Sequence, residues 1–527
     1  MYKKIITLFL TASMALSAVS CAAGESSSSN TSSDGGTAAE YLVGSTLKKT
    51  SGGRMYLEVE GEPFLYTGVQ IRADGYTQLD NRSLAEMEEQ FRLASELGVK
   101  CVEVPISWNE LEPEEDVYNF RKFKTYLEWC LKYDLKLEVL WFSYSTGQSL
   151  EMYVPSYIFD DEETYPQYPS DVKGQVWGEQ GRITFFQMSD RTLLSRERKA
   201  IEQLTDFLYE WENANGNPNV VIAYQVHNEV DNFPRWNIDS RNVLTPDGSE
   251  KLPRETAWQD IYTSLDSAGR AFKESKYRAV TRTNLVALRN SGDEWKDFAV
   301  KIFELEGIDI VGDDTYTSSV SEQTYSMDNL GGEEFGYENL PHVAENSGSF
   351  ANSPTLVLSA VTQGAGYLMY CLSMPMFWIR YETNWDWWEQ GVLTVDWEDK
   401  THTQAVRDIF TGLKKAAVPL AGCEKTDMFA FNAITDTPEA EKQETFTLLN
   451  TQVTLKTSSG ALGYLLQYEG SMYVFTDKEA ELYLENATIS EVTYGSFSGA
   501  DFVVESSAEY SANKVNLSGN CLYKIKL

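Results

Sequence analysis

The sequence has few of the residue types that build metal centres and disulfide frameworks. Its 527 residues include only six cysteines and three histidines, and no two cysteines stand at a CxxC spacing. Apart from Cys21, the cysteines form an odd-numbered set, so neither a zinc site nor a set of paired disulfides is indicated. A glycine-rich phosphate-binding loop is also missing. We therefore expect neither a metal nor a cofactor.

Basic residues are scarce as well. Lys and Arg total 44 against 79 Asp and Glu, which gives a formal net charge of −35. A field of this sign repels phosphate backbones and anionic lipids, so nucleic acid is not an expected partner. Aromatic residues, by contrast, make up 13% of the chain. That richness suits either a large core or a surface that stacks on flat ligands.

One apolar run, residues 5–16, lies near the start of the chain and is too short to cross a bilayer permanently. Two lysines precede it, and Ala-Val-Ser-Cys follows it, ending at Cys21. This order is typical of a bacterial lipoprotein signal peptide, and an ordinary cleaved signal is the alternative. We interpret residues 1–21 as such a signal with lipidation at Cys21, and the serine-rich residues 22–45 as a flexible tether. The expected location is that of an exported bacterial lipoprotein, at the cell surface or a periplasm-facing membrane, held only by its lipid.

Strand-like and helix-like segments alternate from about residue 63 to about residue 413, which is typical of a β/α fold. Ser83 and Glu86 predict a capping box at the start of one helix, and Gly98 predicts its end. We predict an α/β fold with a (β/α)₈ TIM barrel over residues 46–418. The eight candidate strands are 65–71, 99–106, 135–142, 220–226, 279–283, 308–312, 341–344 and 366–370.

The pattern changes after about residue 419. Short alternating strands appear there, separated by Gly, Ser and Asn. Residues 419–527 are therefore expected to form a small antiparallel β domain that resembles a β-sandwich.

Two glutamates stand at the ends of the predicted strands four and seven. Glu229 ends the segment Tyr-Gln-Val-His-Asn-Glu, and Glu345 ends Pro-His-Val-Ala-Glu. Barrel active sites form at the C-terminal ends of strands, and a retaining glycosidase needs two carboxyl groups roughly 5–5.5 Å apart. We therefore predict Glu229 as acid/base and Glu345 as nucleophile, with Glu382 as an alternative nucleophile. Asn228 is placed to reach the 2-hydroxyl of a sugar.

The segments around these residues resemble the retaining (β/α)₈ glycosidases that carry catalytic Glu on strands four and seven. Within that clan the chain is most similar to the β-galactosidase-type glycoside hydrolase families 35 and 42. The similar segments are 108–120, 309–316 and 360–370. The resemblance implies hydrolysis of β-linked glycosides by double displacement, and it implies that Tyr316 lies near the nucleophile.

Four further residues complete the predicted substrate site, namely Trp108, Glu112, Tyr316 and Trp385. Trp385 begins a Trp-Asp-Trp-Trp segment that is too polar for a buried strand and suits a sugar platform. Glu112 either binds hydroxyls or caps a turn, and the aromatic residues have packing as their alternative.

Three functions remain open from the sequence. The first is an exo-acting, β-galactosidase-like enzyme. The second is an endo-β-glycanase of the same clan, and the third is a non-catalytic carbohydrate-binding lipoprotein. An oligo- or polysaccharide is the expected partner in each case.

Overall fold

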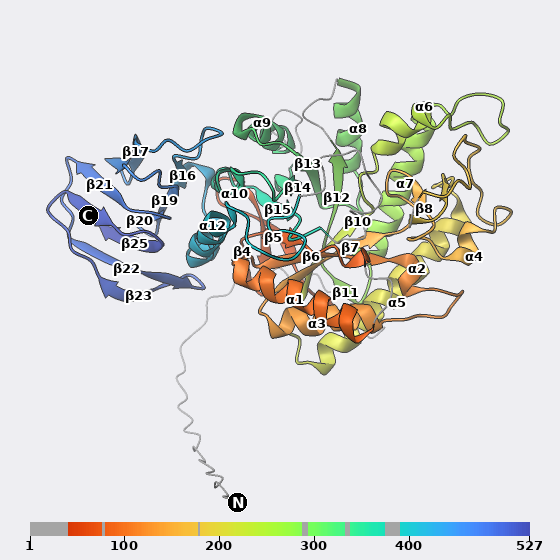
Figure 1. Cartoon of the computed structure of the whole chain (residues 1–527), viewed down its shortest axis with the longest axis horizontal. Helices are drawn as coiled ribbons and strands as arrows, with labels where there is room; N and C mark the ends of the chain where they lie inside the picture. The colour runs from red at the N-terminus through yellow and green to blue at the C-terminus, as the bar shows by residue number, and fades with distance from the viewer. Residues whose placement is uncertain (1–40, 76–79, 178–179, 287–292, 332–337, 375–389) are drawn as a thin grey trace, which may run out of the picture. The chain divides into compact units, whose positions relative to one another are not determined.

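The computed structural model describes residues 41–75, 80–177, 180–286, 293–331, 338–374 and 390–527, and residues 41–527 form one compact unit. Figure 1 shows the strands in the first part of this unit with helices around them, and the antiparallel sheets that end the chain. No helix of the described residues is both long and apolar enough to cross a membrane.

Parallel strands close into a barrel in the order β10-β12-β13-β14-β15-β5-β6-β7. Their side chains are almost all buried, as expected of parallel strands that are covered on both faces. Each of the eight predicted segments overlaps one of these strands, so the predicted TIM barrel is confirmed. The strands are β5 (Thr67–Gln70), β6 (Cys101–Ser107), β7 (Lys136–Phe142), β10 (Val221–Val226), β12 (Val280–Val286), β13 (Ile310–Asp314), β14 (His342–Ser347) and β15 (Gly366–Tyr370).

A helix follows each barrel strand along the chain. In the first of them the prediction of the capping box was wrong, because the N-cap is Asp80, whose carboxylate accepts from the backbone N–H of Ser83. Gly98 ends that helix at φ 94°, as predicted. The outer helices are α1 (Asn81–Leu97), α3 (Arg121–Lys132), α5 (Arg191–Ala214), α7 (Arg254–Lys273), α8 (Asp293–Phe303), α9 (Val320–Leu330), α10 (Ser353–Thr362) and α12 (Thr403–Lys415).

The N-terminal end of the barrel is closed by the first described residues. Strand β1 (Leu42–Val43) pairs with β11 (Tyr277–Arg278), and Ser45 Oγ donates to the Ile222 carbonyl at 2.6 Å. A small sheet of β2 (Thr46–Lys49), β3 (Met55–Val59) and β4 (Glu62–Phe64) adds apolar side chains that pack against the strand starts. The opposite, C-terminal end therefore remains for a functional site.

Short elements lie in the loops at that C-terminal end. The long insertion after β7 buries many of its aromatic side chains and pairs two of its segments, β8 and β9. These elements are η1 (Ala73–Gly75), α2 (Trp108–Leu111), β8 (Ser149–Leu150), α4 (Ser156–Phe159), β9 (Ile183–Thr184), η3 (Phe233–Asn237) and α6 (Ile238–Ser240).

After α13 (Ala417–Gly422) and η6 (Lys425–Asp427) the chain forms two antiparallel sheets with the orders β16-β19-β20-β25-β22-β23 and β17-β18-β21-β24. Their facing sides share a hydrophobic cluster, as in a β-sandwich. The strands are β16 (Met428–Phe431), β17 (Lys442–Leu448), β18 (Thr451–Thr457), β19 (Gly463–Tyr468), β20 (Ser471–Thr476), β21 (Ala480–Glu485), β22 (Glu491–Ser498), β23 (Asp501–Ser507), β24 (Lys514–Leu517) and β25 (Cys521–Lys526).

The outer face of the larger sheet packs on the barrel. Tyr464 and Phe475 belong to the same hydrophobic cluster as the barrel helices, and Tyr464 Oη donates to the Gly412 carbonyl at 2.8 Å. Gly412 lies so close to the Phe475 ring that a Cβ there would stand 2.2 Å from Cζ. The barrel and this sheet therefore share one core.

Candidate active site

Three carboxyl groups meet at the C-terminal end of the barrel. Glu229 follows β10, Asp314 ends β13 and Glu345 lies within β14. One carboxylate oxygen of each lies within 4.8 Å of those of the other two. The structure thus brings together the two glutamates singled out from the sequence and adds an aspartate that sequence reasoning missed.

Strand β14 is longer than the predicted segment 341–344. It runs from His342 to Ser347, so Glu345 is a strand residue with 5% of its surface exposed. The polar residues after Glu345 resemble a loop in sequence, but Asn346 accepts from the backbone of Thr317 at 3.1 Å and donates to its carbonyl at 3.1 Å. These bonds satisfy a buried amide and extend the strand.

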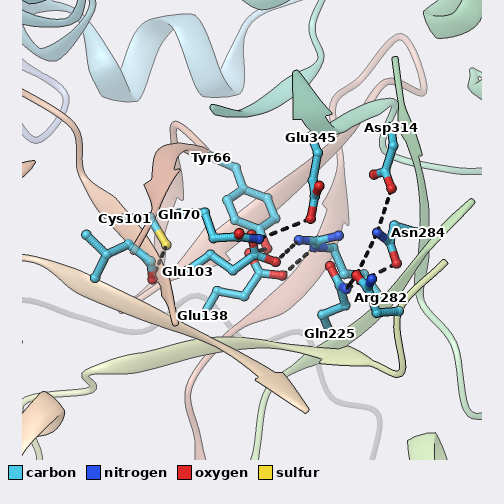
Figure 2. A network of polar contacts seen from close by, with 12 residues as sticks. Tyr66, Gln70, Cys101, Glu103, Glu138, Gln225, Arg282, Asn284, Asp314 and Glu345 are labelled. Atoms are coloured by element: carbon cyan, nitrogen blue, oxygen red, sulfur yellow. Dashed lines mark hydrogen bonds and ion pairs between the residues drawn. The ribbon is translucent and has the colours of Figure 1, made fainter. Parts of the chain in front are cut away.

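The Glu345 carboxylate is surrounded by donors. Tyr316 Oη donates to Oε2. Gln70 Nε2 donates to Oε1 at 3.0 Å, and Figure 2 shows this second bond. Burial raises the pKa of Glu345, whereas these two hydrogen bonds and the positive charges of Arg72 and Arg282 act to lower it. The pKa of Glu345 stays above its ordinary value, but these donors and cations oppose the effect of burial and stabilise the ionised form that a nucleophile needs.

Glu229 has different neighbours. It is half-buried, and Asn232 Nδ2 donates to its Oε2 at 2.8 Å. Burial, then the charges of Glu345 and Asp231, raise its pKa to about 8. Glu345 thus lies among hydrogen-bond donors and cations, whereas Glu229 lies near acidic groups. Such different surroundings separate the pKa values of a nucleophile and a general acid.

The backbone around the site takes strained conformations. His227 (φ 59°), Glu229 (φ 47°) and Tyr316 (φ 33°) all lie in the left-handed region, which is unusual for residues other than glycine. The His227 ring is fully buried and held between Ser143 Oγ at 3.0 Å and Ser264 Oγ at 2.9 Å. These contacts fix the turn that presents Glu229.

Asn284 on β12 connects the residues around Glu229. Its Oδ1 accepts from the backbone N–H of Glu229 at 2.9 Å, and its Nδ2 donates to Asn228 Oδ1 at 3.0 Å and to Asp314 Oδ2 at 2.9 Å. Gln225 Nε2 also donates to Asn228 Oδ1 at 2.9 Å. The carbonyl end of Asn228 is therefore held, and its amino end is the part that can donate to a sugar hydroxyl.

A buried ionic network fills the barrel beneath the site (Figure 2). Arg282 forms ion pairs with Glu103 at 2.5 Å and with Glu138, and Tyr66 Oη donates to Glu138 at 2.5 Å. Gln70 Nε2 donates to Glu103 at 2.9 Å as well as to Glu345, and so joins the network to the Glu345 carboxylate. Part of this network had a signal in the sequence, because Glu103 and Glu138 each interrupt an apolar strand.

Two predicted substrate residues need correction. Trp108 and Glu112 are both 0% exposed, and Trp108 Nε1 donates to Glu112 Oε2 at 2.9 Å. Glu112 Oε1 accepts from the backbone of Asp116 at 2.9 Å and pairs with Arg196. Neither residue offers a surface to a sugar, because each uses its polar atoms on the other and on the loop. We therefore assign them to holding the loop after β6.

Some candidates lie outside the described residues. These are Trp385, the alternative nucleophile Glu382, and Cys21. Their roles stay predictions.

The three clustered carboxyl groups already have partners in the protein. Glu345 accepts from Tyr316 and Gln70, Asp314 from Asn284, and Glu229 from Asn232. These donors use part of the lone pairs that a cation would need. We assign no metal to this cluster.

Two family models match parts of the chain. Residues 78–232 match the model described as beta-galactosidase. The predicted resemblance to glycoside hydrolase family 42 is thus confirmed over that range, which includes Asn228 and Glu229. A second model, described as a domain of unknown function (DUF4978), matches residues 260–438 and includes Asp314 and Glu345.

No curated protein matches the chain. Among solved structures, the chain is similar to a beta-galactosidase from the psychrophilic Marinomonas ef1, at 12% identity and a TM-score of 0.45, covering 68% of this chain and 60% of that one. It is also similar to an exo-beta-1,4-mannosidase from Opitutaceae bacterium strain TAV5, at 13% identity and a TM-score of 0.44, covering 71% and 62%. The chain spans less than two thirds of the length of these proteins.

Proposed function

We propose that the protein is a retaining glycoside hydrolase that cleaves β-linked glycosides of oligo- or polysaccharides, with β-galactosides as the first substrates to test. The observation that carries the proposal is the pair of Glu229 and Glu345. Their nearest carboxylate oxygens lie within 4.8 Å. This closeness supports a retaining pair, whose carboxyl groups stand roughly 5–5.5 Å apart, over an inverting pair at roughly 6.5–9.5 Å.

In the first step Glu345 attacks the anomeric carbon, and Glu229 gives its proton to the departing glycosidic oxygen. The raised pKa of Glu229, to about 8, keeps that proton in place at neutral pH. The hydrogen bonds from Tyr316 and Gln70 stabilise Glu345 as a carboxylate.

In the second step a water molecule attacks the glycosyl-enzyme, and Glu229, now ionised, takes a proton from it. The leaving group is Glu345, which returns as a carboxylate and receives the hydrogen bond of Tyr316 again. The held side chain of Asn228 can direct its amino group to the sugar in both steps.

The two roles are tested by two substitutions. Glu229→Ala should slow cleavage of glycosides with poor leaving groups by roughly 100- to 10,000-fold but affect activated aryl glycosides far less. Azide should partly restore turnover of the aryl substrate and yield a glycosyl azide of retained configuration. Glu345→Ala should lose activity on both substrates, because no covalent intermediate can form.

Glu163→Ala serves as the matched control, because this glutamate is exposed. It should keep the activity of the unchanged protein on both substrates. Equal losses on both substrates for Glu229→Ala, without azide rescue, would remove Glu229 from the acid/base role. An inverted product, followed by NMR, would refute the retaining mechanism.

A further inference from the structure

A third carboxyl group, that of Asp314, lies in the site without a role in the two-step mechanism. Asp314 is the last residue of β13 and is 2% exposed. Its carboxyl group lies within 4.8 Å of both Glu229 and Glu345. Three carboxylates so close together in a buried place cannot all be ionised without a large repulsion, so the cluster must hold protons.

The position of one proton follows from Asn284. The backbone N–H of Glu229 can only donate, so the atom of Asn284 that it meets is the oxygen, and the other end of the amide is the amino group. That amino group donates to Asp314 Oδ2, as Figure 2 shows. Asp314 Oδ2 is therefore an acceptor, and a proton on this carboxyl group belongs on Oδ1.

Asp314 Oδ1 is buried and receives no hydrogen bond from the described residues. The carboxyl groups of Asp314 and Glu229 lie within 4.8 Å of each other, and the neighbouring Asp314 acts to lower the pKa of Glu229. Glu229 uses Oε2 for Asn232, so its other oxygen remains for this contact.

We propose that Asp314 stays protonated through the catalytic cycle and donates its Oδ1–H to Glu229, as a positioning residue that sets the ionisation of the acid/base. The inference rests on the proposed function and goes beyond it. Burial and the charge of Glu345 hold the proton on Glu229, and the hydrogen bond from Asp314 stabilises the carboxylate once that proton has left. Without this donor, the carboxylate form of Glu229 would be less stable. Glu229 would then still serve as the acid, but it would less often be ionised and ready to serve as the base. The proton of Asp314 itself is never transferred.

Burial, then the charges of Glu345 and Glu229, raise the pKa of Asp314 well above its ordinary value. Other ionisable groups around Asp314 and Glu229 also act on the pKa values of these two residues. They are Asp313 on β13, Asp231 after β10 with Arg235 at 3.3 Å, and the Tyr316 hydroxyl.

The protonation state is tested without activity by infrared difference spectroscopy between the unchanged protein and Asp314→Asn. The expected difference contains the C=O stretch of a protonated carboxyl group, and it persists to a pH at which Glu229 has ionised. A carboxylate band in its place at neutral pH would overturn the proposal. Because this readout needs no substrate, it stands apart from the outcome for the proposed hydrolase.

The pH profile of kcat/KM gives the second test. Asn keeps a neutral donor at this position, so Asp314→Asn should leave the alkaline limb within a few tenths of a pH unit. If Asp314 were ionised, the same change would remove a negative charge and move that limb down by about one unit, which would refute the proposal.

Asp314→Leu removes the donor. It should move the alkaline limb upward and slow hydrolysis of the glycosyl-enzyme more than its formation, so that a burst of the aryl leaving group grows. An unchanged limb and an unchanged burst in Asp314→Leu would also count against the role. Glu163→Gln is the control, because this glutamate is an exposed acid outside the carboxyl cluster. It should leave the position of the alkaline limb unchanged.

Discussion

Replacing Arg282 by Met tests whether the barrel interior depends on a buried charge. Arg282, Glu103 and Glu138 are all 0% exposed, and Arg282 pairs with both glutamates. Removing the cation leaves two buried carboxyl groups without their ionic partner. Breaking a buried ion pair from one side costs about 3–5 kcal/mol, and we expect a loss of this size in the free energy of unfolding at neutral pH.

The loss in the free energy of unfolding should grow as the pH rises. Burial raises the pKa of Glu103 to about 8 and also raises that of Glu138, and Arg282 acts against both shifts. Without Arg282 the folded state binds protons that the unfolded state has released above its ordinary pKa of 4.5. The free energy of unfolding therefore falls as the pH rises from there through the folded pKa, so the destabilisation grows toward alkaline pH and shrinks toward acid.

Urea denaturation followed by circular dichroism at several pH values measures this loss. Arg198→Met is the matched control, because its side chain is 40% exposed and its ion pair with Glu274 is a surface contact of at most about 1 kcal/mol. Adding Glu138→Gln to Arg282→Met should recover part of the loss, because position 138 then no longer carries an unpaired buried carboxylate. A loss for Arg282→Met no larger than that of the control, or one independent of pH, would refute the charged network.

Two further outcomes are expected. Tyr316→Phe removes the hydroxyl that donates to Glu345, so kcat/KM should fall roughly 10- to 100-fold and the acid limb of the pH profile should move upward, as a pH–rate series would show. An unmoved acid limb would mean that Tyr316 does not stabilise the ionised nucleophile. Cys21→Ala should release the protein from membranes if the predicted lipid is its anchor, and retention of the variant after a high-salt wash would place the anchor elsewhere.

The barrel could be predicted because its signal repeats along the chain. Apolar runs of strand length alternate with helical stripes, and all eight runs became barrel strands. The end of β14 could not be predicted, since the buried position of Asn346 depends on hydrogen bonds to Thr317, which is distant in sequence. The N-cap at Asp80 was missed because Asp80 and Ser83 lie three residues apart near the start of the helix and are both suitable N-cap residues.

The candidate site was predicted in part. A glutamate at a strand end is visible in the sequence, and so Glu229 and Glu345 could be named. Asp314 could not be separated from its neighbour Asp313 without knowing which of the two points into the barrel. Trp108 and Glu112 were misread because a buried pair that stabilises a loop contains the same residue types as a sugar-binding surface.

The shared core of the barrel and the larger terminal sheet has a consequence for protein engineering. Binding modules in modular enzymes can be exchanged because a linker separates them and each keeps its own core. Here Tyr464 and Phe475 complete the covering of a barrel helix, and Gly412 leaves no room for a different side chain in that place. A foreign module attached after α12 would inherit an apolar helix surface made to fit this sheet alone. The terminal β domain is therefore a part of the packing around the barrel and not a module that can be exchanged.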